Sequence, residues 1–187
     1  MALPGLLIEY LVSGALALPW LLVVTGFKLQ DVPNWQVPLF AVALYVIGMM
    51  VDSAAFALTR PAKWRLRKRV ATKLGIEHRS AVGTAAARLV RLMKYSPEIA
   101  KEVSARSSRD RIARGAVLNA VISAVVLRNS IPWQISVLAC VSLFGMWLFF
   151  EANSYVFELR ADEAIKENER ATANRLQPEG QSRAAHG

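Results

Sequence analysis

Four long apolar runs follow one another along the chain, and polar segments separate them. The runs are Gly5 to Phe27, Val37 to Leu58, Gly115 to Leu127 and Ile131 to Phe150. An apolar helix of about 20 residues is long enough to cross the ~30 Å hydrocarbon core of a bilayer. We therefore predict an all-α membrane protein with four transmembrane helices.

The third run is the shortest, because only 13 residues separate Arg114 from Arg128. Ile112 and Ala113 lengthen it, and long arginine side chains can reach the polar interface from the membrane edge. We expect this run to span the bilayer. The alternative is a three-span protein in which the third run belongs to a soluble core.

The connections within each pair of runs are short. Residues 28–36 join the first two runs and residues 128–130 join the last two, so each pair is predicted to form an antiparallel hairpin. Pro19 interrupts the first run and predicts a kink there. The predicted parts are a first hairpin, a basic helical segment, a second hairpin, and a polar helix end whose tail is disordered from about residue 174. Their ranges are 1–59, 60–111, 112–160 and 161–187.

Charge sets the expected orientation. The chain holds 23 Lys and Arg against 14 Asp and Glu, a net charge of +9. Residues 60–114 alone hold 16 basic against 4 acidic residues, a local net charge of 16 − 4 = +12. Basic loops stay in the cytoplasm, so this block and, with four spans, both termini are expected inside. The architecture is analogous to small multi-pass proteins of the bacterial inner (plasma) membrane, where we place the chain.

The basic block begins at the exit of the second run, where Pro61 is expected to start a new helix. Such a helix suits an anionic bilayer surface, and two further arginines lie at the edge of the third run. The residues predicted to bind anionic headgroups are Arg65, Arg67, Lys68, Arg69, Arg111 and Arg114. A cytoplasmic protein partner is an alternative. Nucleic acid is less favoured, because aromatic residues do not interleave with the cations.

Two more helices are predicted within the block. One covers about residues 80–93. The next begins at Ser96, which is a suitable N-cap before Pro97 and Glu98. That helix is expected to pause at residues 104–108 before it continues into the third run.

Each span carries a polar group toward its cytoplasmic end. These groups are Glu9, Asp52, Asn119 and Glu151. Charge at that depth is costly, so such residues are functional candidates. One interpretation is that they pair with Arg111, Arg114 or the first basic helix and lock the bundle. The other is a site that responds to protons or cations, or the mouth of a conduit.

Small residues line one side of the third run and allow close helix approach. They are Gly115, Ala116, Ala120, Ser123 and Ala124. We expect the contact to lie within the chain. A protein with so few spans has little interior of its own, so a homo-oligomer is also expected.

Catalytic motifs are absent from the sequence. It has no nucleophile elbow, Walker loop or dinucleotide fingerprint, and a single cysteine with two distant histidines predicts no metal site or cofactor. We therefore predict a non-enzymatic, oligomeric inner-membrane protein, either a membrane effector, a channel-like subunit or a scaffold. Its basic segment would dock anionic lipid or a cytoplasmic partner. The alternative is a membrane enzyme or transporter subunit that acts on a lipid or phosphorylated substrate through the buried acids.

Overall fold

The computed structural model describes residues 3–28, 36–75 and 96–184, together with positions 33, 90 and 92–94. All elements in that part of the chain are helices, in agreement with the predicted all-α class. They are α1 (Leu3–Ala15), α2 (Leu18–Thr25), α3 (Val37–Lys73), α5 (Pro97–Val126) and α6 (Trp133–Ala184). The helix expected over residues 80–93 falls largely outside the described residues.

Two of these helices, α3 and α6, are long and apolar enough to cross a membrane. The pair α1 and α2 gives a third candidate span, which is bent by 52°. The chain therefore has the helices of a multi-pass membrane protein. Helix α5, at 30 residues, is long enough to span a membrane, but it is not among the candidate spans of the described residues because its apolar stretch is too short.

The bend between α1 and α2 confirms the kink expected near Pro19. Proline has no backbone N–H, so the carbonyl of Ala15 loses its helical partner. The chain tightens just before the proline, where the Ala17 N–H donates to the Gly14 carbonyl at 3.0 Å. This tighter turn leaves the carbonyl of Ser13 without its usual partner four residues ahead.

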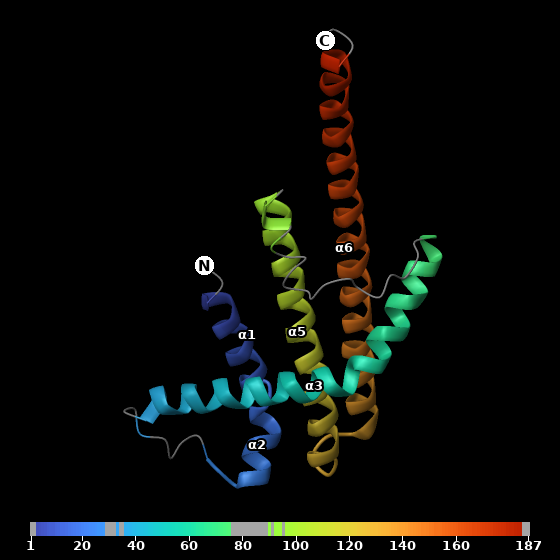
Figure 1. The fold of residues 1–187 in the computed structure, drawn as a ribbon. Helices are drawn as coiled ribbons and strands as arrows, with labels where there is room; N and C mark the ends of the chain where they lie inside the picture. The colour runs from blue at the N-terminus through green and yellow to red at the C-terminus, as the bar shows by residue number, and fades with distance from the viewer. Residues whose placement is uncertain are drawn as a thin grey trace.

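Helix α3 continues through Pro61, so the prediction that this proline begins a new helix is wrong. A proline inside a helix removes one hydrogen bond and bends the axis, and here the bend follows the end of the apolar run. The Thr59 hydroxyl donates to the Ala55 carbonyl at 2.7 Å, a local bond that also favours bending. In Figure 1 the first part of α3 lies across the other helices, and its last part turns to run beside α6.

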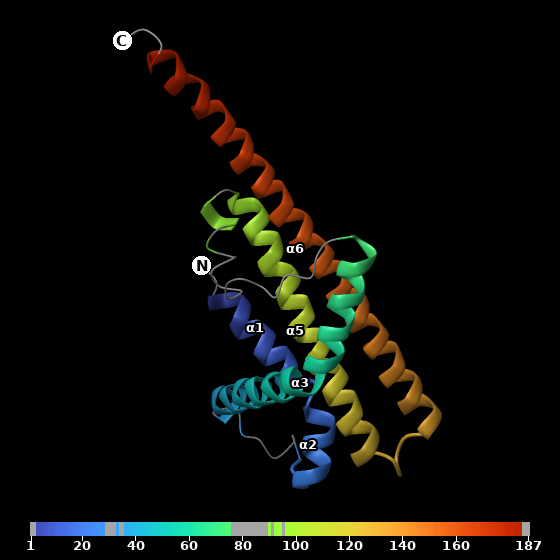
Figure 2. The ribbon, with the colours of Figure 1, turned by 45° about the vertical axis from the view of Figure 1, so that its right-hand side comes forward.

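Helix α5 begins as predicted. Ser96 is its N-cap, and the Ser96 hydroxyl accepts a hydrogen bond from the Ile99 N–H at 3.5 Å. The expected pause at residues 104–108 does not occur, because α5 runs unbroken from Pro97 to Val126. Both views place α5 between α1 and α6 (Figures 1 and 2).

Helices α5 and α6 form the second predicted hairpin, with a turn at residues 127–132. Two apolar clusters hold them together. Trp147 packs on Ala113 and Val117, and further along the helices Ala100 packs near Ile165. Helix α6 extends to Ala184, beyond residue 174 where we expected order to end.

The first two runs do not form the antiparallel hairpin that the sequence predicts, because their helices cross instead of lying along each other. Helix α3 crosses α1, and glycines meet at the crossing. A Cβ on Gly48 would lie 1.9 Å from the Tyr10 carbonyl oxygen, and one on Gly14 would lie 1.9 Å from the Leu44 carbonyl oxygen. Only glycine allows two backbones to approach so closely, and the crossing point is therefore fixed.

Candidate functional site: a layer of buried ion pairs

A single turn of α5 organises the site. It carries Asp110, Arg111 and Arg114, and these three side chains reach toward α1, α3 and α6. Asp110 and Arg114 are buried, although both are charged. A buried charge persists only when it is paired, so the contacts of this turn account for the arrangement of the whole layer.

Glu9 of α1 meets Arg111. The Arg111 Nη1 lies 3.4 Å from Glu9 Oε2, and the Ser108 hydroxyl donates to the other carboxylate oxygen. Both Glu9 oxygens thus have partners on α5. The contact attaches the start of the bent α1–α2 pair to the central helix.

Asp52 of α3 meets Arg114. The Arg114 Nη2 lies 2.5 Å from Asp52 Oδ1, and the arginine side chain is only 5% exposed. Its guanidinium also lies over the Phe56 ring, 5.2 Å from the centroid, and its Nη1 is 3.8 Å from Asp110. A guanidinium in two ion pairs against an aromatic face is well suited to a dry interior.

Glu151 of α6 is the most enclosed acid of the layer, with 1% of its side chain exposed. Lys63 Nζ lies 2.7 Å from one carboxylate oxygen, and Arg67 Nε lies 2.5 Å from the other. Arg67 also reaches Glu158 at 3.8 Å and lies over the Tyr155 ring at 4.8 Å. The last part of α3 is therefore tied to α6 by two cations one turn apart.

Asp110 is a member of the layer that the sequence did not single out. Its carboxylate accepts from the Trp147 indole N–H at 2.9 Å and from Lys63 at 3.2 Å. In the sequence it stands between Arg109 and Arg111, where it looks like a minor interruption of a basic run. Asp110 stands four residues before Arg114, which places both side chains on the same side of a helix. This spacing was the sequence signal for their pairing.

The side-chain amide of Asn119 forms hydrogen bonds with both α1 and α2. Its amide nitrogen donates to the Ser13 carbonyl at 2.9 Å, and its amide oxygen accepts from the Trp20 indole N–H at 3.1 Å. The Ser13 carbonyl is the one released by the tightened end of α1. Asn119 therefore satisfies a helix end inside the bundle.

The residues predicted to bind anionic headgroups fall into two groups. Arg67, Arg111 and Arg114 pair with carboxylates inside the bundle. Arg65, Lys68 and Arg69 are exposed on the other side of α3. Trp64 is exposed beside them, with the Lys68 ammonium 5.5 Å from its ring centroid.

The first member of the predicted small-residue stripe packs against another helix. Gly115 is buried, and a Cβ there would lie 2.6 Å from the Ser13 hydroxyl oxygen. This contact with α1 lies within the chain. The four other members of the stripe are partly buried: Ala116, Ala120, Ser123 and Ala124.

Among the described residues, histidine, cysteine and carboxylate side chains form no group of three or more that could hold a metal ion. The charges of the layer are instead matched by one another. No protein-family model matches this chain, and no curated protein or solved structure matches it either.

Proposed function

We propose that this chain is a non-catalytic, oligomeric protein of the bacterial inner membrane that acts as a scaffold docked on anionic lipid. The observation that supports it is the division of the basic segment. One set of cations neutralises the buried acids, and a second set on the same helix faces outward. The first set holds the bundle together, and the second is free to engage headgroups.

The proposed docking surface consists of Arg65, Lys68 and Arg69 with Trp64 at its edge. An anionic leaflet attracts basic residues by roughly 1 kcal/mol each. An indole ring prefers the headgroup level, so Trp64 suits the same position. Together these four side chains would hold the last part of α3 against the cytoplasmic leaflet.

The proposed topology has four spans, with residues 60–114 and both termini in the cytoplasm. The four are the bent α1–α2 pair, the apolar part of α3, residues 112–126 of α5 and the apolar part of α6. The basic block supports the orientation. In Figure 1 the apolar part of α3 lies crosswise to α5 and α6, and four spans would require it to lie closer to their direction in the membrane.

Cysteine labelling tests this topology in a Cys140→Ala background. Single cysteines at Asn34 and Asn129 are expected to react with a membrane-impermeant reagent from outside, and one at Ser107 is not. External reaction at Ser107 would overturn the orientation. External reaction at the C-terminus alone would show three spans instead of four.

The paired state of the acids favours this proposal over the catalytic alternative. A membrane enzyme or transporter subunit that used Glu9, Asp52 or Glu151 would need a carboxylate able to release its cation. Each of the three is held by at least one cation at 3.4 Å or less. Separating such a pair inside the bundle would leave an unpaired buried charge, which opposes a catalytic or transporting role.

The small interior of one copy supports the proposed oligomer. The buried layer is filled by its own ion pairs, so one copy encloses little further space. The apolar part of α3 is mostly exposed, including Val42, Val46 and Met50. A channel-like role would therefore require several copies, which chemical cross-linking in native membranes can count.

Tryptophan quenching tests the docking surface. The full chain is placed in lipid nanodiscs with brominated acyl chains, and the contribution of Trp64 is the difference from a Trp64→Phe variant. We expect stronger quenching of Trp64 in discs with phosphatidylglycerol than in discs of phosphatidylcholine alone. Replacement of Arg65, Lys68 and Arg69 by glutamine should remove the difference.

The matched control replaces Lys101, Lys166 and Arg170 by glutamine, which removes the same charge elsewhere. This control should keep the wild-type response to phosphatidylglycerol. Equal quenching of Trp64 in neutral and anionic discs would contradict the proposed docking.

A further inference from the structure

One side of α6 is left uncovered by the rest of the chain. Trp147 packs on α5 and Glu151 binds the last part of α3, whereas exposed residues recur on the opposite side at intervals of three, four or seven positions. We call this stripe the outer face of α6. Its residues are Ser142, Gly145, Phe149, Asn153, Arg160 and Glu163.

We propose that the outer face of α6 binds the outer face of a second copy of this chain, in a parallel dimer with a twofold axis. The proposal rests on the oligomer and the topology given above, and it adds the contact surface. A twofold axis sets each residue of the face near the same residue of the other copy. The face must therefore be complementary to itself in packing, hydrogen bonding and charge.

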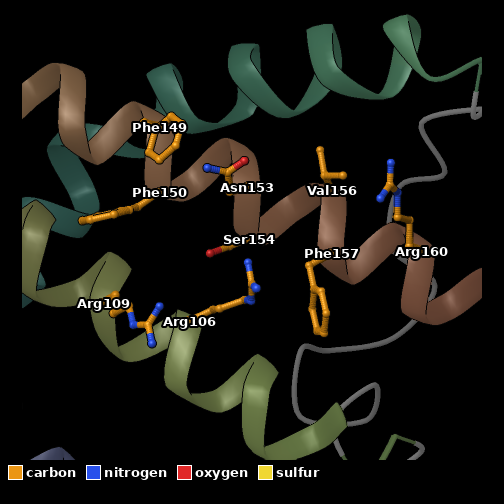
Figure 3. Close-up of a pocket in the computed structure, with 9 residues that line it drawn as sticks. All are labelled: Arg106, Arg109, Phe149, Phe150, Asn153, Ser154, Val156, Phe157 and Arg160. Carbon is orange, nitrogen blue, oxygen red and sulfur yellow. The ribbon is translucent and has the colours of Figure 1, made fainter.

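The outer face points away from α5. In Figure 3, Phe149, Asn153 and Arg160 lie on one side of α6, at the outer edge of the pocket between the two helices. Phe157 points the other way, toward α5, where the Arg106 guanidinium lies 4.4 Å from its ring centroid. The outer face is therefore accessible to a helix of another molecule.

Small side chains lie in the membrane part of the outer face. A Cβ on Gly145 would meet no atom within 4 Å, so this glycine is not used for packing within the chain. Ser142 is exposed one turn before it, and Phe149 is 63% exposed one turn after it. In lipid, small residues let two helices approach closely and stabilise the pair through van der Waals packing.

Asn153 gives the face a hydrogen-bonding group near the cytoplasmic end of the apolar run. Its side chain is exposed and has no hydrogen bond to another described residue. Asn119, by contrast, uses both groups of its amide within the chain. An amide both donates and accepts, so two Asn153 side chains beside a twofold axis can bond to each other. Lipid tails offer no such partner, which favours a second copy over lipid as the occupant of the face.

The charges of the outer face also suit a second copy. Arg160 and Glu163 are exposed, and neither forms an ion pair with another described residue. Lys166 and Asp162, on another side of α6, pair within the chain at 2.5 Å. In a parallel dimer, Arg160 and the partner's Glu163 are offset by about 4.5 Å along the axis, within reach of two long side chains. The twofold axis forms this ion pair twice.

Helix α6 also has the length for such a contact. It runs to Ala184, and Figures 1 and 2 show it extending past the ends of α3 and α5. A polar helix without tertiary packing is only marginally stable in water. A partner helix that continues along the same face would support this extension.

Disulfide cross-linking of the full chain in native membranes tests the pairing, in a Cys140→Ala background. Ser142→Cys and Gly145→Cys each place a single thiol on the outer face. Because a twofold axis brings identical positions together, we expect both to form a disulfide-linked dimer with copper phenanthroline. The matched controls are Val137→Cys and Phe144→Cys, which are exposed on a different side of α6 and should give at least about fivefold less dimer.

Charge exchange gives a second test, with the yield of the Ser142→Cys dimer as the readout. Arg160→Glu should lower the yield at least about threefold, because it sets like charges together. The Arg160→Glu, Glu163→Arg double variant should restore the yield, because it rebuilds the pair with exchanged charges. Lys166→Glu makes the same change of charge off the face and should leave the yield unchanged. A double variant that stays as low as Arg160→Glu would contradict the ion pair.

The pairing and the proposed function fail separately. Equal disulfide yields at outer-face and control positions would show random collision and overturn the pairing. An oligomer seen with an amine-reactive cross-linker, without disulfides at the outer face, would also overturn it and leave the oligomer of the proposed function in place. A single copy in both experiments would overturn the pairing together with that oligomer, whereas the Trp64 response would still test the docking surface.

Discussion

The two faces of the last part of α3 contain the same residue types and have different environments. Lys63 and Arg67 point to α6 and neutralise Glu151, whereas Arg65 and Arg69 are exposed. The two pairs alternate along the sequence with spacings of four residues, so each pair shares one side of the helix. A basic run therefore cannot be counted as one surface, because the acids packed beside it decide which cations remain available.

The largest expected effect comes from removing Glu151, the acid of α6 that pairs with Lys63 and Arg67 on the inward face of α3. Glu151→Gln leaves Lys63 and Arg67 without their main partner, and breaking a buried pair in this way costs about 3–5 kcal/mol. We expect a large fall in the free energy of unfolding, measured by denaturant titration in detergent. Asp162→Asn is the control, since Asp162 is 40% exposed and its ion pair with Lys166 lies on the surface.

Normal stability and oligomeric state in Glu151→Gln, together with loss of a cellular activity, would indicate a functional site. Loss of the folded protein would indicate that the pair is structural. This result separates the two interpretations that the sequence left open for the polar layer.

Much of the layer could be predicted from the sequence by counting residues from the membrane edge. Glu9, Asp52 and Glu151 each pair with a cation, and Arg111 and Arg114 are among those cations, whereas Asn119 bonds to α1 and α2 instead. The physical reason is simple, because an acid within an apolar run has few places to find a cation.

The remaining features depend on tertiary packing. Asp110 belongs to the layer only because Trp147 and Lys63 arrive from two other helices. The sequence likewise gave no sign that α3 crosses α1 at Gly14 and Gly48, since a glycine contact is set by its partner helix.

The second prediction compares two ion pairs of equal length. Arg114 and Asp52 are 2.5 Å apart and mostly buried, whereas Lys166 and Asp162 are 2.5 Å apart with side chains 39% and 40% exposed. A double-mutant cycle on the first pair, with Arg114→Gln and Asp52→Asn, should give a coupling of about 0.5–3 kcal/mol. The cycle on the exposed pair should give roughly 0.3–0.5 kcal/mol.

Within the first cycle, Arg114→Gln should cost more than Asp52→Asn. Arg114 also approaches Asp110 at 3.8 Å, so it retains a partner when Asp52 is neutralised. Equal couplings for the two pairs would show that burial does not strengthen the Arg114–Asp52 ion pair.

The third prediction concerns the outward face alone. Replacement of Arg65, Lys68 and Arg69 by glutamine should change the free energy of unfolding by less than about 0.5 kcal/mol per site, because exposed residues without fixed partners contribute little. The same denaturant titration measures this. A loss as large as that of Glu151→Gln would mean that these cations hold the fold, and the contrast between the two faces would be lost.

The smallest expected effect is the response of each face to salt. Exposed charges are screened over about 10 Å at 0.1 M ionic strength and about 3 Å at 1 M, whereas a dry ion pair is screened much less. Raising the salt should therefore weaken the phosphatidylglycerol-dependent quenching of Trp64 and leave the coupling between Arg114 and Asp52 nearly unchanged. The Lys166–Asp162 coupling should fall along with the quenching, since both depend on exposed charges. If salt weakens the Arg114–Asp52 coupling as strongly, water and ions reach the buried layer. That result would favour the interpretation of the layer as the mouth of a conduit over a purely structural role.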